Sequence, residues 1–369
     1  MLSQPASTLA PTEQFILFGD SITQQCFSPN TTFSFGAALA DTYVRRLDIV
    51  NRGLSGYNTT QALHALPLCM PEPEVTKVRF MTIFFGANDA RIAGSPGGPS
   101  QTVPLNEFKK NIKAMVQSPS VVVHGDIRII FITTPPIDER TLSQTDHEKY
   151  EHLPRNTLRR TAAHTASYAE AVRSLGEELD IPVCDIHTAM LARAGYSRST
   201  SISSDPTSRS TSTSTSTTTR RPSASRSRYP ATPSNASSSS ATATINTPAT
   251  SVTGPATPGS LESPENHTLQ SFFTDGLHFS AEGYRVLFGE LMSLIEETWP
   301  SQMPARLPMR LPPWDLRPAW QTAGEGLSGA RREGGHGQFA GGGVGESDDE
   351  GVRVEGTFEA VVREVRRRM

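Results

Sequence analysis

Long apolar runs, paired cysteines and a strong net charge are missing from this sequence, and each absence excludes a class of protein. No window approaches the ~18 consecutive apolar residues of a membrane-spanning helix, so we expect no transmembrane segment. A formal net charge of −3 over 369 residues gives no basic footprint for nucleic acid. The three cysteines are widely spaced and form no Cys-x-x-Cys pair, which favours free thiols in an intracellular compartment over a disulfide framework.

Targeting and metal-binding patterns are also missing. Residues 1–13 are polar and lack the basic and apolar stretches of a secretory leader, so a cytoplasmic location is expected. Apart from His278, the histidines show no spacing typical of metal ligands. We therefore expect neither a metal nor a cofactor.

A serine stands where a strand is expected to end. The apolar run 15–18 is typical of a buried strand, and Gly19 ends it. Ser21 is thus expected at the carboxyl edge of a sheet, where open α/β folds place their chemistry. A serine hydroxyl needs an adjacent base, and His278 can serve because imidazole, as a class of side chain, can take and release a proton under working conditions. Asp275, three residues earlier, can hold its tautomer. Alone, Ser21 could equally be a helix-capping residue, but the histidine and aspartate favour catalysis.

Two further residues can supply hydrogen-bond donors for an oxyanion. Gly53 follows the strand-like run 47–51, and it is either a turn glycine or a backbone N–H left bare to face the oxyanion. Asn88 follows the apolar run 80–85, and its amide is either a turn group or a donor that points into the same crevice. Asp89 is expected to be a turn or capping group rather than an acid catalyst.

The remaining pattern alternates strands with helices, which predicts a parallel sheet in an α/β fold. Helices are expected over residues 104–117, 155–179 and 280–295, and strands over 128–133 and 181–186. The α/β-hydrolase fold needs a Gly-x-Ser-x-Gly elbow, and this pentapeptide does not occur.

Four short segments together resemble the SGNH (GDSL-type) hydrolase superfamily, and within it the isoamyl acetate-hydrolysing esterase branch. The resemblance covers residues from about 14 to 195 and from about 265 to 315. The matching blocks are Phe-Gly-Asp-Ser-Ile-Thr-Gln (18–24), Arg-Gly-Leu-Ser-Gly-Tyr-Asn-Thr (52–59), Phe-Phe-Gly-Ala-Asn-Asp-Ala (84–90) and Thr-Asp-Gly-Leu-His-Phe-Ser (274–280).

This resemblance implies a flavodoxin-like three-layer α/β/α sandwich with a parallel sheet. It implies that Ser21 is the nucleophile and that Asp275 and His278 complete the triad. The backbone N–H groups of Ser21 and Gly53 and the side-chain amide of Asn88 would form the oxyanion hole. No metal is required for this chemistry.

One segment differs in composition from everything around it. More than half of residues 196–261 are Ser or Thr, with six arginines against one aspartate and few large apolar side chains. Such a segment cannot bury enough apolar surface to offset its ordering entropy, so we expect a disordered insert. It divides one discontinuous hydrolase domain, residues 14–195 and 262–315, and a flexible Gly-rich tail follows over 316–369. A regulatory tether, a basic docking segment and a neutral insertion all fit the insert, and its protein partners are unknown.

The sequence therefore predicts a carboxylic-ester hydrolase that acts on small-molecule acyl esters, acetates above all, through an acyl-enzyme. A nearer alternative is the same machinery acting on a lysophospholipid, a thioester or an acetylated sugar. A more distant one is an inactive scaffold whose insert binds partners. Cys26 is a rival nucleophile, but no motif pairs it with a base.

Overall fold

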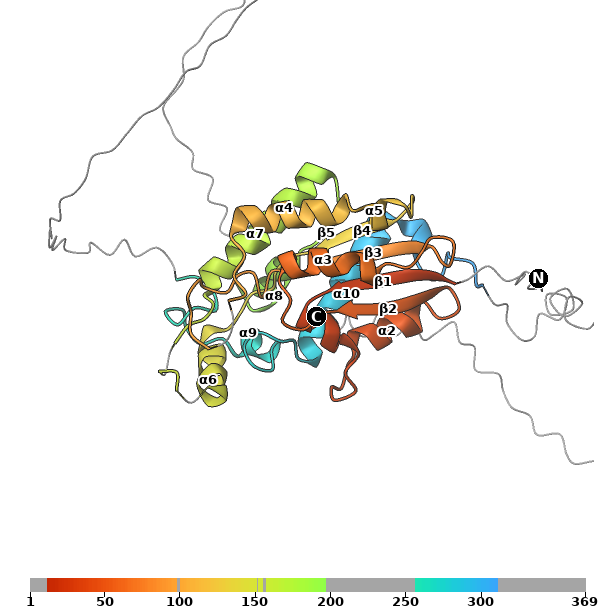
Figure 1. Ribbon diagram of the computed structural model, residues 1–369. Coiled ribbons are helices and arrows are strands. Elements are labelled where there is room, and N and C mark those ends of the chain that lie inside the picture. Colours follow the sequence, from red (N-terminus) through yellow and green to blue (C-terminus); the bar gives the residue numbers. More distant parts are fainter. Residues whose placement is uncertain (1–11, 98–99, 151, 155–156, 197–255, 311–369) are drawn as a thin grey trace, which may run out of the picture. The chain divides into compact units, whose positions relative to one another are not determined.

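The computed structural model describes residues 12–97, 100–150, 152–154, 157–196 and 256–310 (Figure 1). The predicted tail over 316–369 and most of the predicted insert lie outside the described residues.

Five parallel strands form the sheet, in the order β2-β1-β3-β4-β5. The strands are β1 (Glu13–Gly19), β2 (Leu47–Gly53), β3 (Val78–Phe84), β4 (Arg128–Ile132) and β5 (Val183–Cys184). All five expected strands are present, and β5 is shorter than the predicted 181–186. Pro182 has no N–H to donate to the ladder, and Asp185 already caps the next helix by accepting the Thr188 N–H at 3.2 Å.

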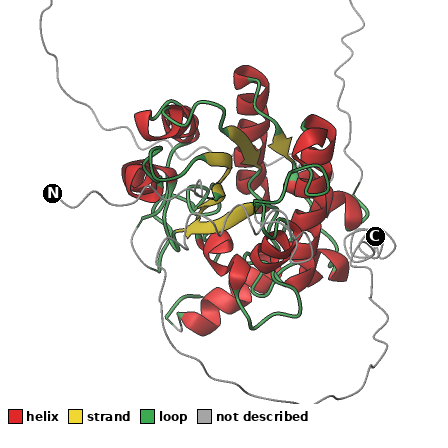
Figure 2. Cartoon of the chain, turned by 90° about the vertical axis from the view of Figure 1, so that its right-hand side faces the viewer, coloured by secondary structure: helices red, strands yellow, loops and turns green. Residues whose placement is uncertain are grey.

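Helices cover both faces of this sheet. Successive side chains of a strand point to opposite faces, so alternate residues pack into two separate cores. On one face, Phe15 and Leu17 of β1 belong to a core with α2 (Phe35–Thr42), α8 (Ile186–Arg193) and α10 (Ala281–Thr298). On the other face, Ile16 and Phe18 belong to a core with α3 (Thr59–Cys69), α4 (Leu105–Val116) and α7 (Ala162–Leu179). In Figure 2 the strands lie between helices on both sides. The predicted three-layer α/β/α arrangement is confirmed.

Shorter elements complete the described chain. They are α1 (Ser21–Gln24), η1 (Gln25–Phe27), α5 (Pro119–Val122), α6 (Glu139–Lys149), α9 (His267–Ser271) and η2 (Pro300–Gln302).

The helix predicted over 155–179 begins later than expected, at Ala162. Thr161 has an extended backbone, and its hydroxyl accepts the His164 N–H at 3.2 Å, so it caps α7. The two residues before this cap, Arg159 and Arg160, are buried, and both form hydrogen bonds with residues 87–97. They therefore belong to a loop beneath the carboxyl edge of the sheet.

Where the chain re-enters the described part at residue 256, it bonds to the start of α6. The backbone N–H of Glu139 donates to the Gly259 carbonyl at 2.8 Å, and the Leu261 N–H donates to the Glu139 carboxylate at 2.8 Å. Residues 256–261, which composition assigned to the insert, are therefore bonded to the hydrolase domain.

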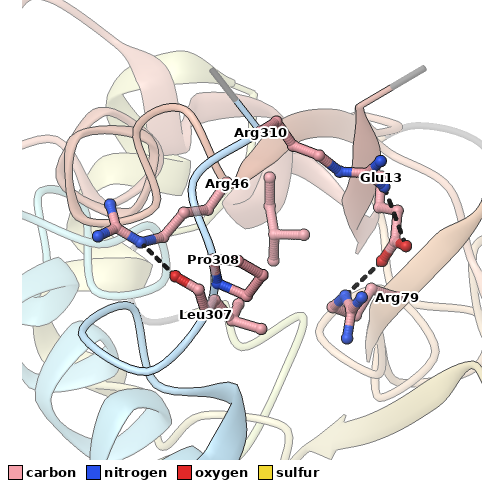
Figure 3. A pocket seen from close by; sticks show the side chains of 7 residues that line it. Glu13, Arg46, Arg79, Leu307, Pro308 and Arg310 are labelled. Atoms are coloured by element: carbon pink, nitrogen blue, oxygen red, sulfur yellow. Dashed lines mark hydrogen bonds and ion pairs between the residues drawn. The ribbon is translucent and has the colours of Figure 1, made fainter. Parts of the chain in front are cut away.

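The last described residues are fastened to the amino edge of the sheet. The Glu13 carboxylate pairs with Arg79 and, at 3.1 Å, with Arg310, while Arg46 Nε donates to the Leu307 carbonyl at 3.1 Å. These side chains surround a hollow of about 290 Å³ (Figure 3). Since each arginine has a partner in the wall, the hollow is explained by the packing of the chain after α10.

Candidate active site

Three strands end side by side at the carboxyl edge of the sheet. Gly19, the last residue of β1, lies in register with Gly53 of β2 and with Phe84 of β3. Ser21 follows the first of these strand ends, and Asn88 follows the third. The sheet therefore brings three of the sequence-predicted site segments to one crevice.

The fourth segment adds a histidine and an aspartate to the same place. Ser21 Oγ lies 2.9 Å from His278 Nε2, and His278 Nδ1 lies 2.6 Å from Asp275 Oδ2. Because the carboxylate can only accept at Nδ1, that nitrogen carries the proton, and Nε2 is free to accept from the serine hydroxyl. The other carboxylate oxygen, Oδ1, accepts the backbone N–H groups of Leu277 at 3.0 Å and His278 at 2.7 Å.

These hydrogen bonds keep the Asp275 carboxyl ionised. Burial alone would raise its pKa, but the hydrogen bond from the His278 ring and the two backbone N–H donors outweigh it, so the pKa lies below the usual value. A carboxylate in this state orients the imidazole and stabilises its protonated form.

The turn that carries Asp275 and His278 is held by α6. Phe273 and Phe279 pair as an antiparallel bridge that closes the turn, and Gly276 at its tip has φ of +82°. A Cβ at Gly276 would lie 2.5 Å from the Leu142 nitrogen and 2.6 Å from the Asp138 carbonyl oxygen. Only glycine fits both the conformation and the space, so α6 sets the position of the turn.

Ser21 sits at the start of the short helix α1 and is 6% exposed. The Asp20 carboxylate accepts the Ile22 N–H at 3.0 Å, and the Tyr284 hydroxyl donates to the Ile22 carbonyl at 2.7 Å. Both backbone groups of Ile22, the residue after the serine, are therefore fixed by side chains.

The Gly53 N–H is not bare, which corrects the sequence-based expectation. It donates to Asn51 Oδ1 at 2.8 Å, and Asn51 Nδ2 in turn donates to the Gln24 carbonyl at 3.1 Å. The side chain of asparagine commonly accepts the backbone N–H two residues further on, so the Asn-x-Gly spacing of residues 51–53 could have predicted this bond. The glycine itself is required by space, because a Cβ there would lie 2.0 Å from the Gln24 nitrogen.

Asn88 is fixed with its amide nitrogen on a defined side. Nδ2 donates to the Tyr57 carbonyl at 2.9 Å, and Oδ1 accepts from Arg160 Nη2 at 3.1 Å and from Gln101 Nε2 at 3.2 Å. A guanidinium can only donate, so the oxygen must face Arg160. The bond to Tyr57 uses one amide hydrogen, and the second remains for another acceptor.

Neither Arg160 nor Asp20 was singled out from the sequence. Arg160 was expected within a helix, and only the Arg-Arg pair before a capping threonine hints at its position. It is 4% exposed, and burial lowers its pKa to about 10, so it stays protonated at neutral pH. Asp89 meets its expectation as a capping group, since it accepts the backbone N–H of Thr59, the first residue of α3, at 2.9 Å.

Cys26 is a poor rival nucleophile. The residue is 1% exposed, and burial raises the pKa of its thiol to about 12, so the reactive thiolate is not populated near neutral pH. All three cysteines are free, as the sequence predicts. In the described part of the chain, no group of three or more His, Cys, Asp or Glu side chains could hold a metal ion.

Comparison with known proteins identifies the family of this chain. The model of the GDSL-like lipase/acylhydrolase family matches residues 17–204, more than half of the chain. The chain belongs to this family. The family assignment supports an ester hydrolase of the serine esterase class, with a small-molecule ester as its substrate, and the α/β fold described above fits it.

Several curated members of the family are similar over long stretches. A GDSL esterase/lipase of Arabidopsis thaliana is 37% identical, covering 48% of this chain and 71% of that protein. The isoamyl acetate-hydrolyzing esterase of Saccharomyces cerevisiae is 27% identical over 82% of this chain and 94% of its own. The human isoamyl acetate-hydrolyzing esterase 1 homolog is 36% identical over 50% and 71%. Among solved structures, the lipase/acylhydrolase from Enterococcus faecalis has a TM-score of 0.45 at 18% identity, covering 82% of this chain and 100% of that one.

None of the helices in the described ranges has the length and apolar character needed to cross a membrane.

The buried carboxyl of Asp20 makes the stability of this family member depend on pH. Burial raises its pKa to about 7, against the opposing effects of the Ile22 N–H, His278 and Arg160, while Asp89 adds to the rise. Between the ordinary value and about 7, the native state holds a proton that the unfolded chain has lost. Stability therefore falls as the pH rises through this window.

We expect Asp20→Asn to remove this loss. Asparagine can still accept the Ile22 N–H as a helix cap, but it never carries a charge. The variant should match the wild type near pH 4 and exceed it above pH 7, by up to about 4 kcal/mol in the free energy of unfolding. Urea unfolding at three pH values across this range measures the difference. Stability curves that run parallel at every pH would show that Asp20 ionises normally.

Proposed function

We propose that this chain hydrolyses small acyl esters, acetates above all, with Ser21 as nucleophile, His278 as general base and Asp275 as the group that orients it. The observation that carries the proposal is the unbroken series of hydrogen bonds from Ser21 Oγ through the His278 ring to Asp275 Oδ2. Their lengths of 2.9 and 2.6 Å are those of a working nucleophile–base–orienter set.

The proposed reaction has two halves. Ser21 Oγ attacks the ester carbonyl carbon while its proton passes to His278 Nε2, and the carbonyl oxygen becomes an oxyanion. The tetrahedral intermediate collapses, the bond to the alcohol oxygen breaks, and His278 returns the proton to the departing alcohol. A water molecule then attacks the acyl-serine, with His278 again accepting and returning the proton, and the carboxylic acid leaves.

The oxyanion is proposed to bind at the edge where the first three strands end. The second amide hydrogen of Asn88 and the Ser21 N–H are the first two donors. The Gly53 N–H joins them when the oxyanion replaces or shares its contact with Asn51. Losing this contact leaves Nδ2 of Asn51 bonded to the Gln24 carbonyl, and water can replace the donor to Oδ1 because Asn51 is only partly buried.

Substrate size is proposed from the relatives. The yeast relative that matches most of this chain is named for hydrolysis of isoamyl acetate. We expect kcat/KM on p-nitrophenyl esters to be highest for acetate or butyrate and to fall toward palmitate. A maximum at palmitate would favour a lysophospholipid, and parallel assays with an acyl thioester and an acetylated sugar test the other two alternatives. Turnover absent on every ester would favour the inactive scaffold.

We also propose a cytoplasmic location. We further propose one discontinuous hydrolase domain, to whose active site residues 197–255 contribute no catalytic or substrate-binding group. The composition of this segment, rich in Ser and Thr and poor in large apolar side chains, gives it little to pack with.

Deleting residues 200–254 and rejoining the chain with a short Gly/Ser linker should leave an active esterase. A shorter loop costs less closure entropy, about 0.6 kcal/mol for each halving of its length, so stability should stay equal or rise. We expect kcat/KM on p-nitrophenyl acetate within about threefold of the full chain. The matched control extends the deletion through residue 261 and so removes the bonds of Gly259 and Leu261 to Glu139, which should lower the melting temperature. A large loss of kcat/KM without unfolding in the first deletion would assign the segment a lid role.

A further inference from the structure

Arg160 is a buried cation directly behind the proposed oxyanion donor. Its Nε donates to the Ala87 carbonyl at 2.5 Å, and its Nη2 donates to Asn88 Oδ1 at 3.1 Å. The neighbouring Arg159 forms an ion pair with the Asp146 carboxylate. Among the described residues, the guanidinium of Arg160 has hydrogen bonds to carbonyl groups and to no carboxylate.

Burying a charged guanidinium without a carboxylate partner lowers the stability of the fold, so its presence here indicates a role. Removing a guanidinium from water is unfavourable unless an anion or aligned dipoles replace the solvent. Here the carbonyl oxygens of Ala87 and Asn88 point at it, and the buried carboxyls Asp20 and Asp146 lie near enough to act on its charge. The hydrogen bonds of the guanidinium are therefore made to the segment that carries Asn88.

We infer that Arg160 is a positioning residue of the oxyanion hole: together with Gln101 it holds the Asn88 amide, and of the two only Arg160 brings a positive charge, which polarises the amide. This rests on the proposed function, in which Asn88 donates to the oxyanion. The bond to Oδ1 prevents the amide from flipping, because a flipped NH2 group would face a group that can only donate. The cation also draws electron density from the amide oxygen, which makes the opposite N–H a stronger donor.

The effect should be greatest in the transition state. A donor strengthened by a fixed cation gains most where negative charge develops on the substrate oxygen, and little where the ester carbonyl is neutral. Arg160 therefore supports kcat rather than KM, and it does so through Asn88 without touching the substrate.

A double-mutant cycle with Asn88 tests this inference. Arg160→Met should lower kcat on p-nitrophenyl acetate by about 10- to 100-fold, with KM changed less than about threefold. In the Asn88→Ala background the same substitution should cost less than about threefold, because the amide it acts through is gone. Arg160→Lys keeps the charge, but one ammonium group replaces the fork that reaches both Ala87 and Asn88. Its loss should be intermediate.

Arg159→Met is the matched control. It removes a buried arginine from the adjacent position, breaks the Asp146 ion pair and leaves the Asn88 bond in place. We expect a lower melting temperature and a change in kcat that is equal in the wild-type and Asn88→Ala backgrounds.

A second readout is the affinity for an alkyl boronic acid. Its boron accepts a lone pair from Ser21 Oγ, the serine proton passes to His278, and the adduct carries an oxygen where the oxyanion would lie. Its inhibition constant should rise in Arg160→Met by the factor by which kcat/KM falls. If Arg160→Met does not fold, Arg160→Lys carries the cycle and this measurement.

The outcomes separate the two claims. Losses that multiply fully in the double mutant, or a change confined to KM, would overturn the role of Arg160 alone. If Asn88→Ala itself leaves kcat unchanged, the proposed oxyanion hole fails first, whatever Arg160 does.

Discussion

Replacing Ser21 by alanine should lower kcat on p-nitrophenyl acetate by about four to six orders of magnitude, and His278→Ala should do the same. Among the residues that the structure describes, His278 Nε2, at 2.9 Å, is the one hydrogen-bond partner of Ser21 Oγ. Because the two groups act as one unit, the double mutant should be no more than about threefold worse than either single variant. Steady-state rates on purified variants of equal melting temperature measure the effect.

Two substitutions in α9 control for this result. Ser271→Ala removes an exposed hydroxyl that bonds only the Thr268 carbonyl, and His267→Ala removes an exposed ring that bonds Gln270. Both should leave kcat unchanged. Losses that multiply fully in the Ser21→Ala, His278→Ala double mutant, or near-normal turnover by Ser21→Ala, would remove the triad assignment.

Replacing Asn88 by alanine should lower kcat by about 100- to 1000-fold with little change in KM. The amide offers a hydrogen that gains most when negative charge develops on the substrate oxygen, so its loss falls on the transition state. The measurement is kcat and KM on acetate and butyrate esters.

Asn111→Ala is the matched control for Asn88→Ala. Asn111 is a similarly buried asparagine whose Nδ2 donates to the hydroxyls of Thr59 and Thr60, within the packing of α3 and α4. Its loss should lower the melting temperature and leave kcat within a few-fold. An Asn88→Ala variant that loses only affinity would place Asn88 against the ground-state substrate instead.

Much of this arrangement was predictable because three of the four motifs lie at the end of a strand. The apolar runs before Ser21 and Asn88 are buried between two layers of helices, so they are almost uniformly apolar and easily recognised as strands. The strand before Gly53 lies at the edge of the sheet and is only partly buried, and it contains Asp48 among its apolar residues. Parallel strands end at one edge, and therefore the motifs that follow β1, β2 and β3 meet there. The contact of Ser21 with His278 spans 257 positions and could be expected only from the chemistry the pair requires.

The features that were not predicted depend on single side-chain bonds. The side chain of Asn51 accepts the N–H of Gly53. The periodicity of apolar residues shows which face of a strand is buried, so it cannot predict a single bond of this kind. Arg160 sits in a loop that looks helical from its neighbours, since the cap at Thr161 starts the helix later. Burial of Asp20 depends on what surrounds the start of α1. Tyr284, which bonds the Ile22 carbonyl there, and Asp89, whose charge raises the pKa of Asp20, come from distant parts of the chain.

The most direct test of the central claim is to label the nucleophile. The full-length protein is treated with an alkyl fluorophosphonate, in which the attacking oxygen replaces fluoride at phosphorus, and the modified residue is located by peptide fragmentation in a mass spectrometer. We predict one phosphonyl group on Ser21, slow labelling in His278→Ala and none in Ser21→Ala. A label on Cys26 or another residue, or equal labelling of Ser21→Ala, would contradict the account.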